Sequence, residues 1–198
     1  MKRTFFSFAL LFCGILSLFG QDKTYRFLDL QITYPSSYCI IYDYEQETDI
    51  LDGNSCSFIV SAIFSNGSEE RMKVEVTETN TASFKMLKAM EMSKEDILSF
   101  CLDAAYEGIK SAPVYSHVKQ TYSKTEATYG YTDYTGRFFR AKRTSDSAYY
   151  ENIIGRVYAF YYGDYYVQFS MQVPNTNNLN TLMAIANSLK YYRKAIYG

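Results

Sequence analysis

One stretch, from Ile153 to Pro174, constrains the fold more than any other part of the chain. It reads IIGRVYAFYYGDYYVQFSMQVP, two runs rich in β-branched and aromatic residues on either side of Gly163-Asp164. Such residues favour strands, and Gly-Asp favours a tight turn between them. The stretch therefore predicts a long β-hairpin. Apolar side chains fall on both of its faces, so we expect it to be the central pair of a sheet that is covered on both sides.

The first 20 residues have the pattern of a secretory signal peptide. Lys2 and Arg3 precede an apolar segment from Phe5 to Phe19, which is shorter than the roughly 20 residues of a membrane-spanning helix. Cleavage is expected near Gly20. No later segment is apolar enough to span a bilayer. We therefore expect residues 21–198 to form a single exported domain that acts outside the cytoplasm, in a periplasm or beyond the cell.

The order of predicted elements indicates the fold class. Strands are expected at 30–34, 38–44, 57–64, 72–79, 114–122, 125–134 and 137–144, before the hairpin, and a short strand is expected after residue 190. A helix begins at Ser93, which forms a capping box with Asp96, and another follows Leu179. Residues 80–92 fit either a helix or a loop. Strands and helices do not alternate regularly, which indicates an α+β fold with a mostly antiparallel sheet.

Composition narrows the functional classes. The formal net charge of −1 gives no global attraction to nucleic acid. The chain contains 21 Tyr and 14 Phe but no Trp. Tyrosine suits a half-buried sheet, with its ring inward and its hydroxyl toward water. The alternative interpretation is an exposed aromatic surface that binds a small ligand or a glycan.

Three short segments resemble a known family. They are Tyr34-Pro35-Ser36-Ser37-Tyr38 after the first strand, the aromatic turn Tyr162–Tyr166, and the closing Ala186–Tyr191 segment. Together with the helix after the first strands, they resemble the PsbP-like fold group, which comprises the extrinsic photosystem II subunit and its non-photosynthetic bacterial relatives. Tyr38 stands where Trp is usual in that group, and Tyr191 where Phe is usual.

The resemblance implies an αβα sandwich with a central antiparallel sheet. It also implies an accessory or binding protein rather than an enzyme, and it transfers no active-site residue to this chain. Fold alone does not determine function.

The cysteines beyond the signal peptide are Cys39, Cys56 and Cys101. Cys39 and Cys56 lie in strands that are predicted to be neighbours, so a disulfide between them is one expectation. Cys101 lies on the apolar face of a helix and is expected to be a small buried thiol. The cysteines and the histidine lack the spacing of a zinc site.

A basic segment combines cations with aromatic residues. It contains Arg137, Arg140, Lys142 and Arg143 around Phe138 and Phe139. On a strand these cations would occupy both faces, which is typical of an edge strand that resists aggregation. The functional interpretation is a patch that binds an anion or a partner, such as lipid head groups, acidic glycans or a protein.

Catalytic and metal motifs are weak. His117 is the only histidine, and Ser116 and Lys119 form an S-x-x-K string on a predicted strand, where the two side chains point apart. The acidic run from Asp43 to Asp52 departs from the EF-hand pattern and is expected to be a solvated loop. No glycine-rich phosphate loop occurs. We therefore expect no catalytic, metal or cofactor site.

The resulting hypothesis is an exported, non-enzymatic protein that binds a protein or another component of the cell envelope. The alternative is a small-ligand or glycan binder that uses exposed tyrosines, and a hydrolase with an unrecognised site ranks third. The sequence leaves the partner and the oligomeric state open.

Overall fold

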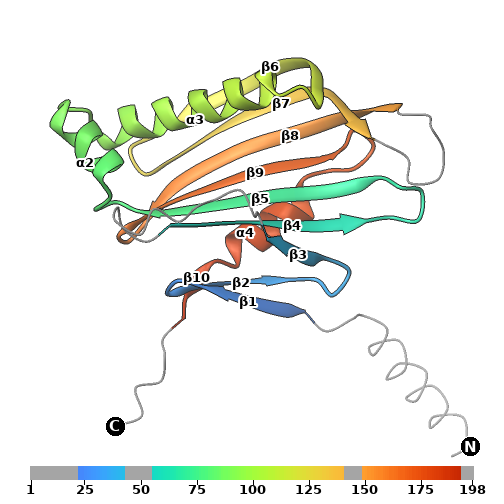
Figure 1. The fold of residues 1–198 in the computed structure, drawn as a ribbon, viewed down its shortest axis with the longest axis horizontal. Coiled ribbons are helices and arrows are strands. Elements are labelled where there is room, and N and C mark those ends of the chain that lie inside the picture. Colours follow the sequence, from blue (N-terminus) through green and yellow to red (C-terminus); the bar gives the residue numbers. More distant parts are fainter. Residues whose placement is uncertain (1–21, 43–54, 141–148, 193–198) are drawn as a thin grey trace, which may run out of the picture.

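The computed structural model describes residues 22–42, 55–140 and 149–192 (Figure 1). The predicted signal peptide and the acidic run lie outside these residues. The elements in chain order are β1 (Lys23–Phe27), β2 (Leu30–Tyr34), β3 (Cys39–Tyr42), β4 (Ser55–Ile63), β5 (Glu69–Glu78), α2 (Ala82–Ala89), α3 (Lys94–Ser111), β6 (Tyr115–Thr125), β7 (Tyr129–Arg140), β8 (Tyr149–Tyr162), β9 (Tyr165–Pro174), α4 (Asn180–Asn187) and β10 (Lys190–Tyr191).

A seven-stranded sheet forms the centre of the molecule. Its strand order is β3-β4-β5-β9-β8-β7-β6, and the neighbouring strands are antiparallel. The predicted hairpin is confirmed as β8 and β9, and β9 is the middle strand. Gly163 has φ +60° in the turn, a conformation that glycine adopts without steric penalty. The α+β class with an antiparallel sheet is therefore confirmed.

Each face of the sheet is covered over a different half. The long helix α3 packs on β6, β7 and β8 on one face. On the other face, α4 and a second sheet, of order β1-β2-β10, cover the half that contains β3, β4, β5 and β9 (Figure 1). The αβα arrangement is confirmed. The small sheet goes beyond the sequence prediction, which places no strand before residue 30.

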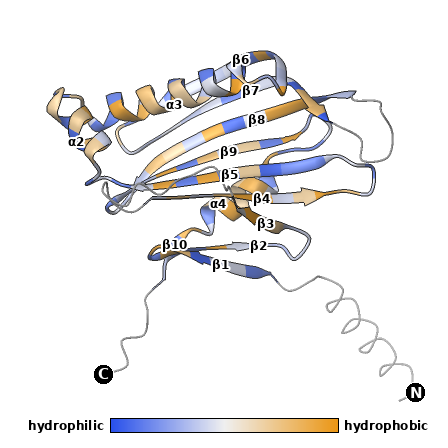
Figure 2. Ribbon diagram, in the orientation of Figure 1, coloured by the Kyte–Doolittle hydropathy of each residue, from blue (hydrophilic) through white to orange (hydrophobic). Residues whose placement is uncertain are grey.

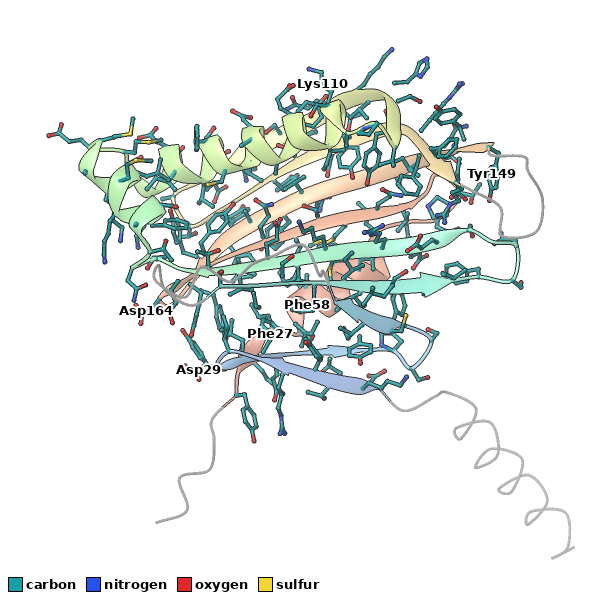
Figure 3. The ribbon with its side chains drawn as sticks, in the orientation of Figure 1. Phe27, Asp29, Phe58, Lys110, Tyr149 and Asp164 are labelled. Carbon is teal, nitrogen blue, oxygen red and sulfur yellow. The ribbon has the colours of Figure 1, made fainter. Side chains whose placement is uncertain are left out.

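Two hydrophobic cores result from this arrangement. The larger one joins β2 and α4 to the central strands, and Phe27 of β1 packs on Phe58 of β4 with ring centroids 4.8 Å apart (Figure 3). The smaller one lies under α3, where Leu98 and Leu102 meet Tyr134 and Val157. Alternate residues of one strand thus serve opposite cores, which is possible because strand side chains alternate between faces.

The helix α3 begins as its sequence predicts. Ser93 is the N-cap, its hydroxyl accepts from the amide of Asp96, and the Asp96 carboxylate accepts from the Ser93 amide at 3.0 Å. The ambiguous segment before it is a helix, α2, with Thr81 as its N-cap. Glu91, at φ +59°, lies in the short connection between the two helices.

One strand prediction is wrong. The two strands expected at 125–134 and 137–144 are a single long strand, β7, which passes through Gly136 without a turn. Gly136 of β7 faces Val118 of the neighbouring strand β6. A Cβ on Gly136 would lie 3.2 Å from a methyl carbon of Val118. The glycine therefore marks a close approach between strands rather than a turn.

Candidate functional site

A groove of about 640 Å³ lies between α3 and the half of the sheet that α3 leaves uncovered. It exists because α3 packs on β6 to β8, while β5 and β9 extend beyond it on the same face. The hydrophilic residues of β5 appear as blue segments of that strand in Figure 2. The lining residues are Arg71, Lys73, Glu75, Thr77, Phe100, Cys101, Ala104, Ala105, Gly108, Ile109, Ala112, Val114, Tyr115, Tyr134, Phe138, Tyr166, Gln168, Ser170 and Gln172.

The helix forms an apolar wall of the groove. Phe100, Ala104, Gly108 and Ala112 are spaced four residues apart, so they lie along one stripe of α3. Three of these four residues are small, and Phe100 is 55 % exposed. A Cβ added at Gly108 would meet nothing within 4 Å. The missing side chains of this stripe therefore leave room beside the helix.

The strands form a polar floor. Their register places Arg71 opposite Gln172, Lys73 opposite Ser170, and Glu75 opposite Gln168. Directly opposed residues lie close enough for their side chains to interact. The floor is therefore a ladder of polar cross-strand pairs between β5 and β9.

In the half of this ladder that contains Glu75 and Gln168, the polar side chains bind one another. The Gln168 amide nitrogen donates to Glu75 at 2.9 Å, and the Gln168 amide oxygen accepts from the Tyr166 hydroxyl at 2.8 Å. Lys73 forms an ion pair with Glu75 at 3.1 Å. Burial raises the pKa of the Tyr166 hydroxyl, which keeps it protonated as a donor. These contacts leave little capacity for a ligand at this end.

The other half has unused donors. The Tyr115 hydroxyl donates to the amide oxygen of Gln172 at 2.7 Å, which leaves the Gln172 amide nitrogen without a partner among the described residues. Arg71, directly opposite, makes no ion pair with any described residue and is half-buried. Burial raises the pKa of Tyr115, and the nearby Arg71 charge opposes that shift. The groove thus combines an apolar wall with a cationic and an amide donor.

The predicted basic patch does not lie on one surface. Arg140 is bound on both sides, by Glu151 at 2.6 Å and by Glu69 at 3.2 Å, and its side chain is 11 % exposed. Arg137 is exposed and lies three residues away on β7, on the opposite face of the strand. Lys142 and Arg143 lie outside the described residues. The patch as a binding site stays a prediction, with Arg140 engaged in a structural ion pair.

The expected Cys39–Cys56 disulfide is absent, and both residues are free thiols. The two strands are neighbours as expected, but Cys39 lies opposite Ser61, five positions along β4 from Cys56. That separation is about 17 Å at strand spacing, far beyond the Cα distance a disulfide spans. The Cys39 thiol instead donates to the Ser61 carbonyl at 3.4 Å.

The remaining candidate residues lie apart from the groove. His117 is exposed, as expected, and has φ +54° at a bulge in the edge strand β6, between Ser116 and Lys119. Two residues of β6 stand opposite Gly136 there, which separates the S-x-x-K pair further. Among the described residues, no group of three or more His, Cys, Asp or Glu could hold a metal ion.

The sequence of β9 carries a signal for the groove in its alternation of polar and apolar residues. In β9, Tyr166, Gln168, Ser170 and Gln172 alternate with the apolar Val167, Phe169, Met171 and Val173. The predicted apolar area on both faces of the hairpin does not account for this polar row, which lines the groove. The neighbouring strand β5 shows the same alternation from Arg71 to Thr77, and its polar residues form the other half of the groove floor.

Comparisons with known proteins describe the fold only. No protein-family model matches the chain, and no curated protein matches it. Solved structures that resemble it include a Bacteroides thetaiotaomicron VPI-5482 protein, at 8% identity and a TM-score of 0.41 over 89% of this chain and 50% of that chain. Another is cyanobacterial PsbP (CyanoP) from Synechocystis sp. PCC 6803, at 10% identity and a TM-score of 0.46 over 87% of this chain and 94% of that one. The chain thus spans half of the length of the Bacteroides protein.

Proposed function

We propose that this chain is an exported, non-enzymatic binding protein of the cell envelope, and that the groove beside α3 is its binding site. One observation carries the proposal: an apolar helix wall faces a strand floor in which Arg71 and Gln172 hold donors with no partner among the described residues. Sites that combine an apolar lining with a few converging polar groups are the usual form of ligand pockets.

Export is supported by the sequence of residues 1–20, with its two cations and its short apolar segment. Among the helices of the described residues, none is long and apolar enough to cross a membrane. A protein that is delivered across a membrane meets envelope proteins and lipids, which are the partner classes proposed here.

A binding role rather than catalysis is supported by the chemistry of the groove lining. The thiol in its lining, Cys101, is half-buried, and burial raises the pKa of that thiol. A thiol held in its protonated form is a poor nucleophile. The only histidine, His117, does not line the groove, so Cys101 has no imidazole base there.

Site-directed photo-crosslinking in envelope preparations tests this function. A photoreactive p-benzoylphenylalanine in place of Phe100 faces the groove, whereas the same group in place of Lys110 lies on the exposed side of the same helix that points away from the groove. We expect a crosslinked product from the first position and not from the second, and intact mass analysis separates a small ligand from a protein partner. Equal crosslinking at both positions, or none at either, would refute the groove as the binding site.

A second candidate function follows from a group of tyrosines on the opposite face of β6, β7 and β8. We call Tyr122, Tyr129, Tyr131 and Tyr158 the tyrosine surface. Tyr122 is 52 % exposed and lies 5.7 Å from Tyr131 between ring centroids, and the Arg156 guanidinium lies 4.4 Å above the Tyr131 ring. Tyr122 is the exposed ring of this group and the other three are half-buried; an exposed ring with polar neighbours suits stacking against a glycan.

The tyrosine surface can be tested separately from the groove. Binding of envelope polysaccharide, measured by co-sedimentation, should fall in Tyr122→Ala and stay unchanged in Phe100→Ala. The reverse pattern, or no binding by wild type, would remove this candidate.

A further inference from the structure

We propose that the ligand of the groove is an apolar monocarboxylic acid, with its carboxylate on Arg71 and Gln172 and its apolar body along α3. This inference rests on the proposed function, because it names the occupant of the same groove. The argument has three parts: the charges of the floor, the geometry of the two donors and the shape of the helix wall.

The charges along β5 leave Arg71 without a counter-ion among the residues that the structure describes. The charged residues that share one face of β5 with Arg71, at alternate positions, are Glu69, Lys73 and Glu75. Glu69 binds Arg140 at 3.2 Å and accepts from Ser61 at 2.5 Å, while Glu75 binds Lys73 and Gln168. The acids on either side of Arg71 are therefore engaged elsewhere. A half-buried guanidinium with no described counter-ion is stabilised by a ligand that supplies a carboxylate.

The second donor is fixed in place beside Arg71. Gln172 is only 3 % exposed, and the hydrogen bond from Tyr115 identifies its amide oxygen as the occupied end. The free amide nitrogen is thus the end available to a ligand. Because Arg71 and Gln172 are direct cross-strand partners, their Cβ atoms lie about 5 Å apart. A guanidinium and an amide N–H at that spacing can bind the two oxygens of one carboxylate.

The helix wall suits an elongated apolar body. The stripe from Phe100 to Ala112 extends about 18 Å along the helix axis. A glycine inside a helix is about 1 kcal/mol less favourable than alanine. Neither a turn nor a close contact explains Gly108, since a Cβ there would meet nothing within 4 Å. The volume of about 640 Å³ lies in the range of small-molecule sites.

The test measures binding of three probes to the purified protein by isothermal titration calorimetry. Decanoate combines the carboxylate with an apolar chain, decyltrimethylammonium keeps the chain but reverses the charge, and acetate keeps only the carboxylate. We expect wild type to bind decanoate and to bind the other two at least 10-fold more weakly.

Matched variants locate the site. Arg71→Met should weaken decanoate binding by about 10- to 100-fold, the range for loss of a charged hydrogen-bonded contact. Lys73→Met is the control, because Lys73 lies on the same face of β5 but already pairs with Glu75, and it should change the affinity less than 3-fold. Gly108→Leu should abolish binding while the protein stays folded, since the new side chain enters the open groove.

The outcomes separate the two levels of the proposal. If Gly108→Leu blocks decanoate but Arg71→Met does not, the groove remains a binding site and the carboxylate assignment is overturned. A fourth probe, a short peptide with a free apolar C-terminus, tests a protein occupant: if it binds in an Arg71-dependent manner and decanoate does not, the occupant is a protein terminus and the inference is overturned. If Gly108→Leu affects neither the probes nor the Phe100 photo-crosslink, the proposed function itself fails.

Discussion

Replacing Gly155 with alanine should destabilise the protein sharply, because another residue already occupies the space above it. Gly155 of β8 lies directly opposite Tyr134 of β7, and the Tyr134 ring lies over the glycine backbone. Tyr134 is 2 % exposed, and its hydroxyl donates to the Met171 carbonyl at 3.4 Å. A Cβ on residue 155 would overlap the ring atoms of Tyr134, so the ring or the strand must move.

Two limits bracket the expected magnitude. Overpacking of a tight core typically costs 1–3 kcal/mol, and complete loss of a buried aromatic side chain costs about 3–5 kcal/mol. Expelling the Tyr134 ring from its site would approach the second limit. We therefore expect Gly155→Ala to lower the free energy of unfolding by about 3 kcal/mol. In a chain of this length that corresponds to a fall of about 6–12 °C in Tm.

The measurement is urea unfolding followed by circular dichroism, with a double-mutant cycle. In a Tyr134→Ala background the new methyl group meets no ring, so Gly155→Ala should have little effect, and the coupling between the two sites should exceed about 1.5 kcal/mol. Gly108→Ala is the control glycine, because its Cβ would be unobstructed and it should be neutral or stabilising by up to about 1 kcal/mol. A change below about 0.5 kcal/mol for Gly155→Ala, or additivity in the cycle, would refute this reasoning.

Three further predictions concern charges and thiols. Arg140→Ala should lower stability by about 3 kcal/mol, because it leaves two mostly buried carboxylates unpaired, whereas the exposed Arg137→Ala should change it by less than about 0.5 kcal/mol in urea unfolding. Equal effects of the two variants would contradict the ion-pair assignment. At pH 8 iodoacetamide should label the exposed Cys39 and spare Cys56, because burial raises the pKa of Cys56 to about 12; mass spectrometry that finds equal labelling would contradict this. Hydrogen bonds from the N-cap serine lower the pKa of Asp96, so its contribution to stability is present above the unfolded-state pKa and is lost as pH falls through the lower folded-state pKa. Asp96→Asn should therefore be less stable than wild type at pH 6 and should converge with it in strong acid, and a constant difference across pH would contradict this.

Local sequence signals predicted the elements well. The hairpin of β8 and β9 and the start of α3 follow from alternation, turn residues and capping chemistry that act within a few positions of the chain. The sequence predicts two strands where the structure has the single strand β7, because a glycine such as Gly136 is typical of turns. Its role is set by Val118 on the neighbouring strand, which only the strand pairing reveals.

The candidate site depended on long-range pairing. Arg71 and Gln172 become neighbours only through the register of β5 and β9. The partner of Glu69 is Arg140, 71 residues away in the chain. Because that pair forms, Arg140 is not available to the predicted basic patch, and Arg71 has no acidic partner within the described part of the chain. No local sequence pattern indicates which acid pairs with which arginine, because the paired residues are far apart in the chain.

The sequence by itself determined which segments become strands and helices and that the sheet would be covered on both faces. Side-chain alternation and caps are local properties, and they do not depend on what lies opposite. Only the tertiary structure decided that the two faces of the sheet are covered over different halves. As a result, the polar cross-strand pairs of β5 and β9 remain open to the groove beside α3. The physical reason is that the alternation of side chains along a strand determines which face each residue occupies. Register and packing then decide whether that face meets a helix, a charged partner or an open groove.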